Sequence, residues 1–173
     1  MKQILSAFAR YNRGANAALA AILAAQPAAI LEDEQGSFYK TIHATFAHIV
    51  GAEVGWLRRY PTFFPCKALE GKALVTADIE DTRRRMDSDV RELVSISGEA
   101  DGLFVSFVDD IEEKRLSERF KYKNYRGDEI DRPLWAFIFH VLNHGTHHRG
   151  EISALLDRKG VKNDYSGFTN YTT

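Results

Sequence analysis

Apolar side chains recur at spacings of three and four along most of this chain, a periodicity typical of amphipathic α-helices. The first such segment runs from Lys2 to about Gln26 and ends near Pro27. Its apolar positions are Ile4, Leu5, Phe8, Tyr11, Ala15, Leu19, Ile22 and Leu23. A helix with one apolar stripe must bury that stripe against another element, so we expect an all-α fold of packed helices.

Two further helices are expected in the middle of the chain. Ser37 is a plausible N-cap for a second helix that runs to about Tyr60, where Pro61 breaks the chain. Thr76 is expected to cap a third helix, because acidic residues follow it and complement the positive end of the helix dipole. That helix is expected to reach Ser97.

The last third of the chain changes character before it returns to helical periodicity. Residues 101–110 suit a short helix or a turn. Aromatic residues alternate with charged ones over 116–130, and the turn residues at 126–128 predict a small β-hairpin there. Pro133 suits the first turn of a fourth long helix, which stops at Gly160. We therefore expect a four-helix bundle with a small β-hairpin before the last helix.

Length and charge indicate an ordinary globular protein. The chain has 173 residues, enough for one domain over 1–173 with its own core. It carries 23 basic and 24 acidic side chains, so nucleic-acid binding is not expected. The apolar stretch at 15–25 is too short to span a bilayer and lacks the features of an export signal. Cys66 is the single cysteine, which suits a reducing cytoplasm.

The histidines carry the main chemical signal, because all six fall in two clusters. They are His43 and His48 in the second helix, and His140, His144, His147 and His148 in the fourth. Two imidazoles one helical turn apart can reach one metal ion, whereas residues eight apart are separated by about 12 Å of rise. The pair is therefore His140 with His144, or His144 with His148. The second pair is preferred because it leaves His140 deeper among aromatic residues.

A third ligand has to come from another helix. His48 and His43 lie at opposite margins of the apolar arc of the second helix, and either margin could face the fourth helix. Geometry prefers His48 only slightly. From the residues alone, hydrogen-bonded histidines without a metal are an equal alternative.

Longer motifs resemble the DinB family. They are "HATFAHIVGAEVGWLRR" from His43 to Arg59, "NHGTHHRGE" from Asn143 to Glu151, and the hairpin with its lead-in, "YKNYRGDEIDRPLWAFIFHVLNH". The resemblance implies an up-down-down-up four-helix bundle in which three histidines hold a divalent metal. Carried over by motif, the implied ligands are His48, His144 and His148. The resemblance also implies a homodimer packed through helices.

Two neighbours of the implied ligands are candidates for accessory catalytic roles. Family members usually have glutamine after "HRG", where this chain has Glu151. This carboxylate lies one turn from His147 and three residues from His148, so it could orient an imidazole, or it could simply be solvated. Arg149 could pair with Glu53 or reach solvent.

Three neutral imidazoles would leave an ion with open coordination positions, which is typical of catalytic sites. Imidazole ligands suit several metals, and zinc or nickel is the expected ion. Because relatives include thiol-dependent transferases, the resemblance implies a metal-dependent S-transferase or hydrolase acting on a small thiol and an electrophilic substrate. The alternative is a metal-binding stress-response protein without turnover.

Overall fold

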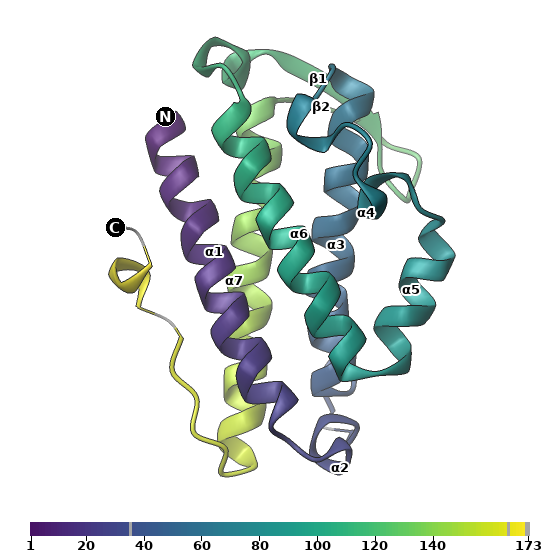
Figure 1. The fold of residues 1–173 in the computed structure, drawn as a ribbon, viewed down its shortest axis with the longest axis vertical. Helices are drawn as coiled ribbons and strands as arrows, with labels where there is room; N and C mark the ends of the chain where they lie inside the picture. Colours follow the sequence, from purple (N-terminus) through teal and green to yellow (C-terminus); the bar gives the residue numbers. More distant parts are fainter. Residues whose placement is uncertain (35, 166, 172–173) are drawn as a thin grey trace.

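The computed structural model describes residues 1–34, 36–165 and 167–171. Within those residues the chain forms seven α-helices, three short 3-10 helices and a two-stranded antiparallel sheet. Four helices are long, and Figure 1 shows them running alongside one another. They are α1 (Lys2–Ala24), α3 (Ile42–Phe63), α6 (Val90–Asp110) and α7 (Leu134–Arg158). The protein is therefore mostly helical, as the apolar periodicity predicts.

The apolar stripes of the four long helices meet in one core. Helix α1 packs against α6 and α7, and α3 packs against the same two helices. Large side chains from each helix are almost completely buried there, among them Leu19, Phe46, Leu57, Phe104 and Leu142. Full burial of one such side chain contributes about 1.5–3 kcal/mol to stability. This core holds α3 against α7, which is where the histidines lie.

The N-cap of helix α3 lies four residues after the predicted cap, and the helix ends three residues beyond the predicted end. Thr41, not Ser37, is the N-cap, and its hydroxyl accepts a hydrogen bond from the Ala44 N–H. The chain before it turns through Lys40, whose φ of 67° lies in the left-handed region. Pro61 does not break the helix, because a proline in the last turn removes only one helical hydrogen bond.

The expected third helix is two helices. Thr76 ends the short helix α4 (Ala73–Thr76), and Asp78 caps α5 (Ile79–Ser88) by accepting from the Asp81 N–H. Asp89 then has extended backbone and caps α6 with its carboxylate. Because a capping residue lies outside the helical conformation, it separates α5 from α6. The segment 101–110, predicted as a separate turn or helix, is the second half of α6.

The predicted hairpin is confirmed. Strands β1 (Arg119–Lys123) and β2 (Glu129–Pro133) pair antiparallel, and Gly127 occupies the turn with a φ of 85°. Pro133 ends β2 and is the N-cap of α7, and Gly160 ends that helix with a φ of 70°. Positive φ is a conformation that glycine adopts without strain.

Short elements complete the structure. They are α2 (Ala28–Leu31), which joins α1 to α3, and the 3-10 helices η1 (Lys67–Leu69), η2 (Glu113–Ser117) and η3 (Phe168–Asn170). The segment after α7 returns along α1, where Phe168 contacts Tyr11 and Phe8. Among the described residues, no helix combines the length and apolar character that a membrane span requires.

Candidate metal centre

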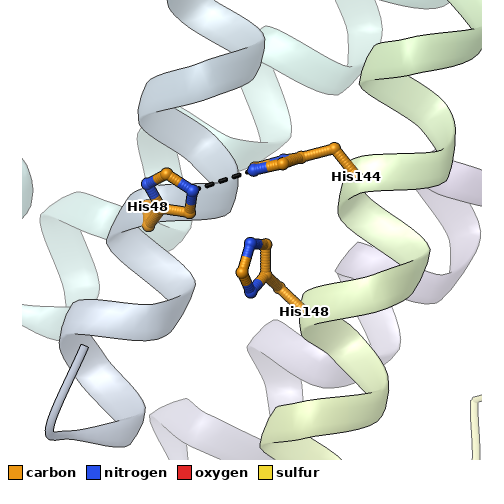
Figure 2. Close-up of side chains that lie close together, drawn as sticks. All are labelled: His48, His144 and His148. Carbon is orange, nitrogen blue, oxygen red and sulfur yellow. Dashed lines mark hydrogen bonds between the residues drawn. The ribbon is translucent and has the colours of Figure 1, made fainter. Parts of the chain in front are cut away.

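His48, His144 and His148 meet between α3 and α7 (Figure 2). The first comes from α3, and the other two stand one turn apart on α7. One ring nitrogen of each lies within 4.8 Å of the others, so the group could hold a metal ion. The spacing argument for His144 with His148 and the preference for His48 agree with this arrangement.

The rings form a compact cluster. Their centroids lie 4.6 to 4.8 Å apart, and the Nε2 atoms of His48 and His144 are 2.8 Å apart. His148 is buried, while His48 and His144 are half-buried. The cluster therefore lies at the edge of the core, within reach of solvent.

This donor set fits a divalent ion. Metal–nitrogen bonds of about 2.0–2.1 Å place two ligand nitrogens at most about 4 Å apart, and the His48–His144 separation already satisfies that limit. A ring nitrogen has one hydrogen or one lone pair, so neighbouring nitrogens satisfy one another poorly through hydrogen bonds alone. Three nitrogens converging on one point are better satisfied by a cation.

The cluster disfavours protonation. Burial, followed by the neighbouring His148 and His48, lowers the pKa of His144 to about 3. Burial and then His148 lower the pKa of His48, while Glu151 acts in the opposite direction. At neutral pH these two imidazoles are neutral and carry a lone pair, which is the form that binds metals.

Glu151 lies beside the cluster, where it contacts a ligand candidate. Its Oε2 is 3.0 Å from Nδ1 of His148, the nitrogen that can donate when Nε2 carries the lone pair. A carboxylate on the second nitrogen of a histidine selects its tautomer and orientation. His147 is exposed, with its ring 4.8 Å from that of His148, and it forms a second possible group with His148 and Glu151.

The other two histidines lie apart from this cluster. His43 is buried, with Nδ1 2.5 Å from Glu32 Oε1 and Nε2 2.8 Å from the Met86 carbonyl oxygen. Both of its ring nitrogens are thus engaged elsewhere. His140 is exposed, although we expected it deeper among aromatic residues, and its ring lies 6.1 Å from that of His144.

Tyr39 is a neighbour of the cluster that the sequence did not indicate. Its hydroxyl lies 2.8 Å from Nε2 of His48, and its ring stacks on the His48 ring with centroids 4.1 Å apart. Burial and then the charge of Glu151 raise the pKa of its hydroxyl. Tyr39 belongs to the segment between α2 and α3, where no periodicity could place it.

A buried polar network extends inward from α7. The Arg149 guanidinium, 2% exposed, donates to the side-chain oxygens of Asn12 at 2.6 Å and Asn16 at 2.8 Å. Asn12 in turn donates to Glu53 and Asp101, both at 3.1 Å. Arg149 and Glu53, which the sequence suggested as a pair, are therefore linked through Asn12. Asn12 and Asn16 are uncharged, so the spacing of charged residues could not identify them as members of this network.

Two buried carboxyls in this network resist ionisation. Burial raises the pKa of Asp101 to about 7, although Asn16 and Arg149 oppose the shift. Burial and then the nearby Asp101 raise the pKa of Glu53 well above its ordinary value. One side-chain oxygen of Glu53 is buried without a hydrogen-bond partner, which favours the protonated form.

The mostly helical fold and the three histidines that could hold a metal ion place this chain among helical proteins with a possible metal site. The DinB family model matches residues 1–171, and the chain belongs to the DinB family. It is similar to Protein DinB of Bacillus subtilis (strain 168), with 26% identity over 164 residues, covering 87% of this chain and 83% of that protein. No solved structure matches it.

Proposed function

We propose that this protein binds one divalent metal ion through His48, His144 and His148 and uses it as an enzyme on small molecules. The observation that carries the proposal is the convergence of three imidazoles from α3 and α7, of which His48 and His144 have pKa values lowered by burial. Three protein ligands leave room for a substrate group, as in catalytic zinc sites. Family membership supports the same conclusion.

The architecture is part of the proposal. We take the four long helices to form the up-down-down-up bundle of the family, in a single domain over 1–173. The packing of α1 and α3 against both α6 and α7 supports this arrangement. Such a bundle places cofactor sites between facing helices, and the three histidines occupy that position.

The reaction class is a thiol-dependent transfer or a hydrolysis. A bound zinc or nickel ion would supply Lewis acidity and activate a nucleophile. Glu151 would hold the His148 ring in its ligand orientation, and the exposed His147 would exchange protons with solvent. A groove of about 430 Å³ between α3 and α5 includes His48 in its lining but neither His144 nor His148, so it borders the site on the α5 side of His48. This volume suits a small thiol or electrophile.

Metal analysis of protein purified without a histidine tag or nickel resin tests the site. We expect about one divalent ion per chain at neutral pH, and its loss in His144→Ala. The matched control is His140→Ala, which removes an exposed histidine outside the cluster and should retain the ion. Metal-free wild-type protein, or equal metal content in His144→Ala, would overturn the proposal.

A non-catalytic metal protein is the second candidate. The ligands lie on two different helices, so an ion would cross-link α3 to α7 and stabilise the fold. Turnover of an electrophile that requires both the metal and a small thiol would favour the transferase. Thermal stabilisation by the metal, without turnover across thiol and ester substrates, would favour the second candidate.

A further inference from the structure

We propose that Tyr39 is the hydrogen-bond donor for a small anion, such as a thiolate or carboxylate, held at the open position of the three-histidine site. This inference rests on the proposed metal site. It gives a role to a side chain on the α2–α3 segment that contacts two of the three histidines. In this role Tyr39 would contact the bound substrate group directly.

Contacts of its ring and of its backbone fix the position of Tyr39. Its ring stacks on His48 with an interplanar angle of 22° and meets the His148 ring edge-on at 5.4 Å. Its backbone lies two residues before the cap of α3, and the Thr41 N–H donates to its carbonyl oxygen at 2.8 Å. The start of the helix that carries His48 therefore also places the phenol.

While the site is free of metal, the Tyr39 hydroxyl can donate to Nε2 of His48. His48 Nε2 is 2.8 Å from the Tyr39 oxygen and 2.8 Å from His144 Nε2, so two groups compete for one ring nitrogen. Once the His48 lone pair is engaged by an ion, the Tyr39 hydroxyl loses that acceptor. A half-buried donor without an acceptor is unfavourable, and a neighbouring anion would restore the hydrogen bond.

The open position is the natural place for that acceptor. The hydroxyl is as close to His48 Nε2 as His144 Nε2 is, so it borders the space where the ligand nitrogens converge. Glu151 already bonds to His148 and cannot donate when ionised. Among the described residues, the Tyr39 hydroxyl is a hydrogen-bonding group that touches a ligand nitrogen from outside both α3 and α7.

Azide binding to the cobalt-loaded protein tests this role without an activity assay. The visible absorption of Co(II) reports both the ligand set and azide binding. Because hydrogen bonds to charged groups are strong, we expect Tyr39→Phe to raise the Kd for azide about tenfold or more. Phenylalanine keeps the ring stacked on His48 and removes only the hydroxyl. Tyr125→Phe, on the exposed hairpin turn, is the matched control and should bind azide as the wild type does.

The outcomes separate the inference from the proposed function. Weaker azide binding by Tyr39→Phe, with one cobalt per chain and an unchanged azide-free spectrum, supports the proposal. An unchanged Kd overturns it while leaving the metal site intact. Loss of the cobalt from Tyr39→Phe also overturns it, because Tyr39 would then help to hold the ion itself. Failure of the wild type to bind cobalt overturns the proposed function and the inference together.

Discussion

At the scale of single residues, the cluster depends on which nitrogen each imidazole presents. His148 is buried, and its Nδ1 faces the Glu151 carboxylate at 3.0 Å. That contact leaves Nε2 for the cluster and limits rotation of the ring. We therefore expect Glu151 to orient His148 without ligating the proposed ion, whereas the exposed His147 touches His148 only by a ring contact, with centroids 4.8 Å apart.

Removing the Glu151 carboxylate should weaken metal binding. We expect Glu151→Ala to lower the affinity for zinc about 10–100-fold, the usual effect of losing such a carboxylate. Glu151→Gln keeps an acceptor for Nδ1 and should lie between the wild type and the alanine variant. Competition with a chelating indicator measures the affinities. His147→Ala is the control, and an equal loss in that variant would contradict the orienting role.

At the scale of elements, the segment before α3 carries the one non-glycine residue with positive φ among those that the structure describes. Lys40 has a φ of 67°, which costs a non-glycine residue about 1–2 kcal/mol. It connects Tyr39, which stacks on His48, to Thr41, which caps the helix. The contacts on both sides hold the turn in this conformation, and strained backbone of this kind often occurs at functional sites.

Glycine at position 40 should relieve this strain. We expect Lys40→Gly to raise the free energy of unfolding by up to about 1 kcal/mol, because the released strain exceeds the added flexibility of the unfolded chain. The lost ion pair with Glu34 is exposed and contributes little. Urea denaturation measures the change. Lys72→Gly, at a φ of −72°, is the control and should not stabilise; stabilisation of both variants alike would refute the argument.

At the scale of the whole molecule, the buried network joins all four long helices. Asn12 of α1, Glu53 of α3, Asp101 of α6 and Arg149 of α7 are linked by hydrogen bonds through the asparagines. Buried polar groups are costly unless they are paired, so this network favours one arrangement of the helices. It lies next to His148 along α7 and thereby ties the cluster to the core.

The network should make stability depend on pH. Asp101 has a pKa of about 7 in the folded protein, above its ordinary value of 3.8, so the folded state keeps a proton that the unfolded state has lost. The favourable contribution of Asp101 to the free energy of unfolding is complete below about pH 4 and is lost as the pH rises to about 7. The raised pKa of Glu53 acts in the same direction.

Asp101→Asn isolates this contribution. We expect the unfolding free energy of the wild type, relative to the variant, to fall between about pH 4 and pH 8. His48 and His144 have lowered pKa values and act with the opposite sign, but they are present in both proteins and cancel in the difference. Urea denaturation of both proteins across this pH range measures the difference in unfolding free energy. A difference that is independent of pH would show that Asp101 is ionised in the fold.

Local patterns were enough for much of the fold and of the candidate site. Apolar spacing predicted α1 and α7, and alternation with turn residues predicted the hairpin, because these signals depend only on neighbours along the chain. The one-turn spacing of His144 and His148 follows from helix geometry in the same way. The DinB resemblance then predicted His48 as their partner, and the three lie together.

Other features depended on contacts that the spacing of residues along the chain does not indicate. The break at Asp89 and the start of α3 at Thr41 depend on which of several capping residues meets a free N–H. Tyr39 meets His48 because a loop turns back over its own helix, and Asn12 meets Arg149 across 137 positions. Pairings of this kind have no periodicity in the sequence, since packing of the helices creates them.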